Sequence, residues 1–256
     1  MNMVNMRAEC ERILEAAGKQ NVLLRVIGGM AVHLHCPTTS HLPALSREYG
    51  DLDFVTASPD DQRMRAFFES IGFSANSRFN ALQGANRMIF DCKECDWHID
   101  IFINKFHMCH DIKFSHARLE QDPVTIPLAE LLLTKFQIVA INPKDVKDVA
   151  ALLIEHPLGD TDRETINVPR ILEVASHDWG FYTTVRMNLE KMPQFLEALQ
   201  LPAAETKVIA GKLDELGKRM EAAPKSATWK MRALLGKSIP WYEEPEDAAR
   251  GELKLE

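Results

Sequence analysis

Three aspartates in short apolar frames constrain the fold of this chain more than any other feature. Asp51 and Asp53 lie in the segment 50–55, and Asp100 lies in the segment 98–102. Alternate residues of a strand point to the same face of a sheet, so Asp51 and Asp53 would project together while the residues between them point into the core. An aspartate within a strand as apolar as 98–102 is costly to bury without a partner. The pattern predicts strands that bring three carboxylates to one site.

A divalent metal is the partner that such carboxylates favour. Two adjacent carboxylates repel each other unless a cation lies between them, and Mg²⁺ takes one or two carboxylates together with substrate phosphates. Mn²⁺ accepts the same oxygen ligands. A third carboxylate on a second strand would complete a two-metal site for in-line transfer of a phosphoryl or nucleotidyl group. The alternative is an ordinary exposed strand face, because short Asp-x-Asp segments are common in proteins.

A glycine pair precedes these aspartates. Gly28 and Gly29 follow the apolar segment 22–27 and lead into a segment with the composition of a helix start. In that context backbone N–H groups and a helix amino terminus can hold phosphate, although a tight turn that needs positive φ explains a glycine pair equally well. Arg47, in the polar segment 38–49, could neutralise phosphate charge as a planar fork or could lie on the loop surface.

Composition limits the classes of protein to which the chain can belong. Its 256 residues are 46% hydrophobic, enough to bury a sizeable core in one large domain or two small ones. The formal net charge of −7 argues against a generally basic nucleic-acid surface but leaves a local basic groove open. Five cysteines at irregular spacing, with no apolar leader, favour a reduced cytoplasmic setting and free thiols. No apolar segment reaches the ~20 residues that span a bilayer, so we expect no membrane partner.

The spacing of apolar residues changes near Pro123. Before it, helices are expected at residues 6–17 and 60–70, and short apolar segments predict strands. The last two of these strands would form a hairpin. The strands are expected at residues 22–27, 51–56, 87–91 and 97–104. After it, helices are expected at residues 128–141, 144–155, 168–176, 181–199, 203–221 and 228–235. We therefore predict a first domain over residues 1–122, an α-helical domain over 123–240, and an acidic, flexible tail over 241–256.

The order of these motifs carries a resemblance. A Gly-Gly pair, then Asp-x-Asp between apolar residues, then a lone aspartate between apolar residues resembles the motif set of the polymerase-β-like nucleotidyltransferase superfamily. The segment Leu-Leu-Leu-Thr-Lys-Phe-Gln at 131–137, followed by Lys-Asp-Val-Lys-Asp-Val at 144–149, is similar more narrowly to the AbiEii/AbiGii branch. That branch includes toxins of type IV toxin–antitoxin pairs. The resemblance covers residues 20–155.

The resemblance implies a fold and a role for each residue of the first domain. The fold would be an α/β (α+β) nucleotidyltransferase core with a small mixed sheet, followed by an α-helical domain. Asp51 and Asp53 would ligate the catalytic metals, and Asp100 would complete the metal site and help to deprotonate the acceptor hydroxyl. Gly28 and Gly29 would hold the triphosphate through backbone donors.

The resemblance extends to two residues of the helical domain and has one departure. Lys135 would reach a phosphate, and Asp148 matches the last acid of the branch's lysine-and-aspartate signature. Without the resemblance, both would be assigned to a solvated helix face. The Ser or Thr that commonly follows the glycines is Met30 here, which removes a hydroxyl contact to the phosphates.

The function implied is transfer of a nucleoside monophosphate from an NTP to a hydroxyl, with Mg²⁺ or Mn²⁺ as cofactor. The acceptor would be RNA, a protein or a small molecule, and a toxin would have a cognate antitoxin as partner. One rival is a non-catalytic protein of the same fold that binds a nucleotide or a partner. Another is an aminoglycoside-type nucleotidyltransferase, whose cationic acceptor would suit the acidic balance of the chain.

One further motif stays open. Cys92 and Cys95, with His98 close behind, could supply half of a tetrahedral zinc site at the tip of the predicted hairpin. The other half is undefined, so free cysteines on a turn are the simpler interpretation.

Overall fold

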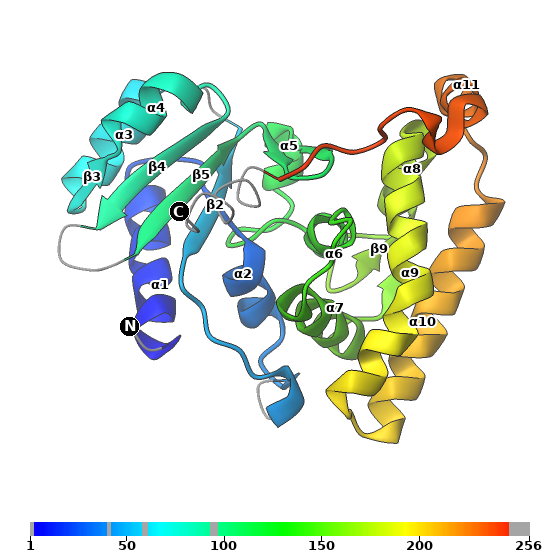
Figure 1. Cartoon of the computed structure of the whole chain (residues 1–256). Coiled ribbons are helices and arrows are strands. Elements are labelled where there is room, and N and C mark those ends of the chain that lie inside the picture. Colours follow the sequence, from blue (N-terminus) through cyan, green and yellow to red (C-terminus); the bar gives the residue numbers. More distant parts are fainter. Residues whose placement is uncertain (1–2, 40–41, 58–60, 93–96, 246–256) are drawn as a thin grey trace, which may run out of the picture. The chain divides into compact units, whose positions relative to one another are not determined.

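The fold is built around a mixed sheet whose five strands come from the first half of the chain (Figure 1). A computed structural model describes residues 3–39, 42–57, 61–92 and 97–245. The strands are β1 Arg25–Ile27, β2 Leu52–Thr56, β3 Phe73–Ala75, β4 Arg87–Cys92 and β5 His98–Ile103. They are hydrogen-bonded in the order β1-β2-β5-β4-β3, with β2 and β5 parallel and the other neighbours antiparallel. The predicted small mixed sheet in an α+β chain is therefore confirmed.

The chain divides into two compact units that interleave along the sequence. The first unit comprises Met1–His35, Arg47–Phe106 and Lys113–Pro127. The second comprises Cys36–Ser46, His107–Ile112 and Leu128–Glu256. The division into domains at 1–122 and 123–240 stays a prediction. It places both short segments, Cys36–Ser46 and His107–Ile112, in the first domain.

The helices of the first unit alternate with its strands or follow them along the chain. They are α1 Met3–Lys19, α2 Gly28–His35, α3 Asp61–Ser70, α4 Ser77–Gln83 and α5 His116–Leu119. In α1, Met6, Cys10, Ile13 and Ala17 lie at helical spacing and are buried, whereas Leu14 of the same stripe is half-buried.

One face of the sheet forms the core of the first unit. Leu52 and Phe54 on β2 are fully buried. Leu52 is in register with Ile99, and Ile99 is in register with Phe90, so these side chains share a face. Phe68 of α3 stacks on Phe90 with ring centroids 4.4 Å apart. The polar residues of the same strands therefore lie on the opposite face.

The second unit consists mainly of helices. They are α6 Leu128–Phe136, α7 Pro143–Glu155, α8 Val168–His177, α9 Trp179–Leu199, α10 Ala203–Ala222 and α11 Ala227–Leu235, with the short helices η2 Pro43–Leu45 and η3 Gly236–Ser238. Two short parallel strands, β8 Leu158–Gly159 and β9 Ile166–Asn167, precede α8. Within the described ranges, none of the helices combines the length and the apolar composition needed to cross a membrane.

Local sequence explains where these helices begin. Asn142, Asn167, Asp178 and Ser226 precede α7, α8, α9 and α11, and the side chain of each accepts a hydrogen bond from the backbone N–H three residues on. Such caps satisfy backbone donors that a helix start leaves without a helical partner.

Hydrogen bonds tie the two inserted segments to the helices of the second unit. The backbone N–H of Thr39 donates to Glu155 of α7 over 2.5 Å, and Lys147 of α7 donates to the carbonyl of Ser46 over 2.7 Å. The second segment lies in the two-stranded sheet of β6 Lys105–His107 and β7 Asp111–Lys113. Within it, the backbone N–H of His110 donates to Gln137 over 3.0 Å.

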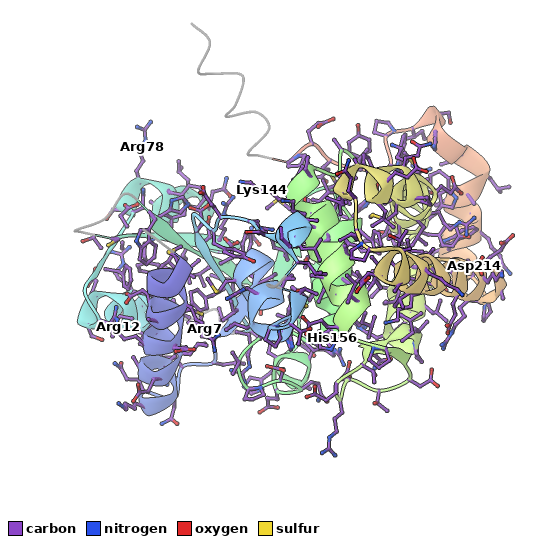
Figure 2. All side chains as sticks on the ribbon, turned by 90° about the horizontal axis from the view of Figure 1, so that it is seen from below. Arg7, Arg12, Arg78, Lys144, His156 and Asp214 are labelled. Atoms are coloured by element: carbon purple, nitrogen blue, oxygen red, sulfur yellow. The ribbon has the colours of Figure 1, made fainter. Side chains whose placement is uncertain are left out.

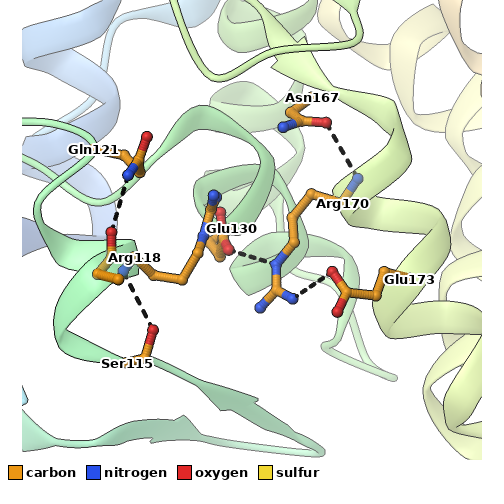
Figure 3. A network of polar contacts seen from close by, with 8 residues as sticks. Ser115, Arg118, Gln121, Glu130, Asn167, Arg170 and Glu173 are labelled. Atoms are coloured by element: carbon orange, nitrogen blue, oxygen red, sulfur yellow. Dashed lines mark hydrogen bonds and ion pairs between the residues drawn. The ribbon is translucent and has the colours of Figure 1, made fainter.

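A buried ion pair connects α6 with α8 (Figure 3). Glu130 is fully buried, and its carboxylate accepts a 2.8 Å hydrogen bond from Nε of Arg170. Arg170 also donates to Glu173 over 2.8 Å, one turn along α8. Asn167 accepts from the backbone N–H of Arg170 and so caps the same helix end. This network satisfies the Glu130 carboxylate within the helical core.

Several sequence predictions need correction. The helix expected over 128–141 ends at Phe136, because the side chain of Asn188 donates to the carbonyls of Phe136 and Ile138 over 2.8 Å each. Asp51 precedes β2 and is not within it. The sequence did not predict the short elements β3, α4, α5, β6, β7, β8 and β9.

The expectation of free thiols was partly wrong. Cys92 is disulfide-bonded. Cys10, Cys36 and Cys109 are free and buried, as expected of reduced cysteines in a core. Cys95 lies outside the described residues.

Candidate functional site

Two of the predicted aspartates face each other across the parallel pair of strands. Asp53 of β2 and Asp100 of β5 are in register, and Asp53 is also in register with Ile27 at the end of β1. Asp51 lies one residue before β2, two positions from Asp53, and is exposed, whereas Asp53 is half-buried and Asp100 is buried. The structure thus brings Asp51, Asp53 and Asp100 to one side of the sheet, opposite the α3 core.

Asp100 is held by two cationic or polar side chains. Arg87 of β4 donates from Nε to Oδ1 over 2.8 Å and from Nη2 to Oδ2 over 2.9 Å. His98 lies two residues away on the same strand face, with Nε2 3.3 Å from Oδ2. Because Ile89 is the register partner of Asp100, Arg87 lies diagonally across the strand pair, within reach of a long side chain. Both carboxylate oxygens of Asp100 therefore have partners from its own sheet.

These contacts change the pKa values of both titrating groups. Burial raises the pKa of Asp100, but hydrogen bonds from His98 and Arg87 outweigh it and lower the pKa below its usual value. The hydrogen bond to Asp100 raises the pKa of His98, and the charges of Asp51 and Asp53 add to that effect. His98 therefore lies within electrostatic range of all three aspartates. Asp100 is a weak base in this environment.

Gly28 fits the turn between β1 and α2 because it has no side chain. Its φ is +74°, a conformation that L side chains rarely adopt. A Cβ at this position would lie 2.5 Å from Oδ2 of Asp53. The glycine backbone at the start of α2 therefore approaches the Asp53 carboxylate closely, which places a helix amino terminus next to one of the predicted metal ligands.

The backbone of Gly29 likewise lies close to the side chain of Arg47. A Cβ on Gly29 would lie 2.5 Å from Nη2 of Arg47 and 3.0 Å from the ring of Tyr49. The guanidinium of Arg47 lies 4.7 Å from the centroid of the Tyr49 ring, a cation–π contact. Tyr49 in turn contacts the ring of His33 on α2, with centroids 5.5 Å apart. Arg47 is thus positioned beside the start of α2.

Lys135 and Asp148 lie together in the second unit. Nζ of Lys135 is 2.9 Å from Asp148 and 3.1 Å from Asp145, both on α7. Lys135 and Asp148 are buried, so their assignment to a solvated helix face is wrong. Two carboxylates on one ammonium leave the group with a net negative charge. Any contact of Lys135 with a phosphate would compete with both acids.

The donor set allows a test of the predicted metal site. Asp51 and Asp53 fit a hard divalent cation, because their carboxylates lie two residues apart on the accessible side of the sheet. Asp100 fits less well, since Arg87 and His98 occupy its oxygens. Across the part of the chain that the structure describes, no group of three or more His, Cys, Asp or Glu side chains is arranged to hold a metal ion.

Sequence reasoning missed three residues at these positions. Arg87 begins β4, Tyr49 supports Arg47, and Asp145 shares Lys135 with Asp148. The register of the β4–β5 hairpin would have identified Arg87, because it sets which residue lies diagonally across from Asp100. No comparable signal in the sequence points to Tyr49.

Comparison of the chain with protein families, with curated proteins and with solved structures found no match. The site is therefore interpreted from its own geometry and chemistry.

Proposed function

We propose that the chain is a metal-dependent nucleotidyltransferase that moves a nucleoside monophosphate from an NTP to an acceptor hydroxyl. The close approach of the glycine turn to Asp53 carries this proposal. It sets backbone donors at a helix start beside a carboxylate that can hold a cation, and a triphosphate bound to a divalent metal needs both.

The phosphate-binding side of the proposed site is formed by Gly28, Gly29 and Arg47. The N–H groups at the start of α2 and the positive end of the helix dipole would bind phosphate oxygens. Arg47, stacked on Tyr49, would add a planar guanidinium that can pair with a phosphate through two hydrogen bonds. Met30 offers no hydroxyl at the next position, so these donors would bear most of the phosphate charge.

The metal-binding side is formed by Asp51 and Asp53. When bound there, Mg²⁺ or Mn²⁺ would neutralise phosphate charge and orient the triphosphate. In the reaction, the acceptor oxygen forms a bond to the α-phosphorus, and the bond from the α-phosphorus to the bridging oxygen breaks. Pyrophosphate leaves with that electron pair, and the hydroxyl proton passes to solvent. Asp100, with its lowered pKa, serves the site better as a fixed anion than as the base.

Two cations that could have contacted an acceptor already have partners. Arg25 donates to the carbonyls of Leu119 and Asp122, and Lys135 is engaged by Asp145 and Asp148. Arg25 and Lys135 thus each bind groups within their own unit. RNA, a protein and a cationic small molecule are all retained as acceptors in the experiment below, and a toxin acting on RNA or protein would have a cognate antitoxin.

The test follows transfer of label from α-labelled NTPs with Mg²⁺ or Mn²⁺. Acceptors are total RNA, a protein extract and an aminoglycoside set. We expect label on one acceptor class with the wild-type chain, and a loss of at least about 100-fold in Asp53→Asn, as when a single group that stabilises the transition state is removed. The fold should persist, because Asp53→Asn relieves repulsion between neighbouring carboxylates.

A matched control uses an acid far from the site in sequence. Asp214, on α10, is exposed and pairs with the exposed Lys218 at 2.6 Å (Figure 2). Asp214→Asn should transfer label like the wild type. Equal transfer by Asp53→Asn would refute the catalytic proposal. Nucleotide binding without transfer by the wild type would favour the non-catalytic rival.

A further inference from the structure

We infer that Arg87 is a resident cation at Asp100, so that the site takes one divalent metal ion, on Asp51 and Asp53, and Asp100 positions Arg87 and is not a ligand of a second metal. This inference rests on the proposed function, whose two-metal form expects all three aspartates to bind metal.

The first argument is the occupancy of the Asp100 oxygens. Arg87 takes both of them through a two-bond fork of 2.8 and 2.9 Å, and His98 approaches Oδ2 as well. Such a fork matches the carboxylate geometry and is among the strongest polar contacts in proteins. A metal ion could bind Asp100 only by displacing at least one of these donors.

The second argument is that Arg87 is held on other sides too. Its guanidinium carbon lies 5.2 Å from the ring centroid of Phe102 and 5.7 Å from that of Phe79. The Arg87 side chain is only 13% exposed and that of Asp100 only 6%. A guanidinium stacked at two rings loses these contacts as well if it swings away from Asp100. The resting position of Arg87 is therefore set by the Asp100 carboxylate and two aromatic rings together.

The third argument is the contrast with the other two aspartates. Asp51 is exposed and Asp53 is half-buried. Asp100 is buried and is in contact with both Arg87 and His98. The three carboxylates thus differ in exposure: Asp51 and Asp53 are the more accessible pair, and Asp100 is the buried one, paired with Arg87. Arg87 would supply, as a fixed guanidinium, the positive charge that a second metal brings to the reacting phosphate.

The inference is tested by counting bound metal ions. Equilibrium dialysis of the full chain against Mn²⁺ and a non-hydrolysable α,β-methylene NTP gives the excess of Mn²⁺ on the protein side per chain. We expect one Mn²⁺ per chain for the wild type. Asp53→Asn should lose it, and Asp100→Asn should keep it, with an apparent Kd changed by less than about tenfold.

Each other outcome has a distinct meaning. Two Mn²⁺ per wild-type chain, one of them lost in Asp100→Asn, would overturn the inference while supporting the proposed function. No bound Mn²⁺ in the wild type would overturn the proposed function itself and the inference with it. If Asp100→Asn does not fold, the double variant Arg87→Gln/Asp100→Asn, which replaces the ion pair with two amides, gives the same readout.

A matched arginine variant controls for loss of charge alone. Arg78 belongs to α4 and its side chain points away from the ribbon (Figure 2). Arg78→Gln should bind one Mn²⁺ as the wild type does. Arg87→Gln should weaken nucleotide-dependent transfer while Arg87→Lys restores part of it, since lysine keeps the charge but not the fork. Equal transfer by Arg87→Gln and wild type would show that Arg87 has no such role.

Discussion

At the scale of single residues, register and burial give similar aspartates different roles. Asp53 and Asp100 are aligned on neighbouring parallel strands, yet Asp53 lies against the Gly28 backbone and Asp100 lies under Arg87 and His98. Their immediate sequences are both apolar, so the sequence alone offers no basis for separating them. Contacts from the turn that follows β1 and from β4 make the difference, and β1 and β4 lie on opposite sides of these strands in the sheet.

Two glycine-to-alanine substitutions test the turn between β1 and α2. Gly28→Ala should lower the free energy of unfolding by about 1–3 kcal/mol, because alanine is strained at positive φ and its Cβ would meet Asp53. Gly18→Ala is the control: a Cβ there has open space, and alanine in α1 should stabilise the chain by roughly 0.5–1 kcal/mol. Urea unfolding of both variants gives the two signs. A neutral Gly28→Ala would contradict the strained turn.

The His98–Asp100 contact predicts a dependence of stability on pH. The pKa of His98 is raised from its usual 6.5, so its contribution is full below that value and is lost as pH rises through the folded pKa. The pKa of Asp100 is lowered from its usual 3.8, so its contribution is present above that value and is lost as pH falls through the folded pKa.

Urea unfolding between about pH 5 and pH 8 isolates the histidine part of this prediction. The free energy of unfolding of the wild type should fall as pH rises above 6.5. His98→Gln, which keeps a hydrogen-bond donor but no titrating group, should lack that part of the fall. Identical pH profiles for the two proteins would show that the contact contributes nothing to folding.

At the scale of elements, caps and buried polar contacts decide where the helices begin and end. Side-chain caps at Asn142, Asn167 and Asp178 are visible in the sequence and explain why α7, α8 and α9 begin where they do. The early end of α6 depends on Asn188, more than 50 residues away, which bonds two carbonyls after the last turn. Local signals therefore predict helix starts better than helix ends in this chain.

The Arg170–Glu130 pair predicts a large effect at the contact between α6 and α8. Arg170→Met removes an ion-pair partner from a fully buried carboxylate and should cost about 3–5 kcal/mol of the free energy of unfolding. Lys218→Met is the control, because its pair with Asp214 is exposed on both sides and should change stability by less than about 1 kcal/mol. Thermal or urea unfolding measures both, and similar losses in the two variants would contradict a special role for the buried pair.

At the scale of the whole molecule, the chain is interleaved and not simply divided. It passes from one unit to the other after His35, Ser46, Phe106, Ile112 and Pro127. The returning segments are bonded to α7 and to Gln137 within the second unit. The predicted boundary near Pro123 rests on a change in periodicity, and short segments such as Cys36–Ser46 and His107–Ile112 carry no periodicity of their own from which a passage could be predicted.

The interleaving predicts that the first half of the chain does not fold alone. A fragment of residues 1–127 retains Cys36–Ser46 and His107–Ile112 but lacks the helices that hold them. Those segments would lose their hydrogen bonds and leave apolar residues in water, so the fragment should unfold without a cooperative transition in urea. The full chain is the control. A cooperative transition of the fragment would show that the first unit is autonomous.

The sequence by itself determined the alternation that puts Asp53 opposite Leu52, the strand–turn–helix at Gly28, and the bounds of most helices of the second half. Periodicity and caps suffice for these because they depend on neighbours within a few residues. Only the tertiary structure decided that Arg87 lies over Asp100, that Lys135 is enclosed by Asp145 and Asp148, and that two loops belong with the later helices. These contacts join residues 10 to more than 100 positions apart. Strand register and helix packing, which no local pattern specifies, bring them together.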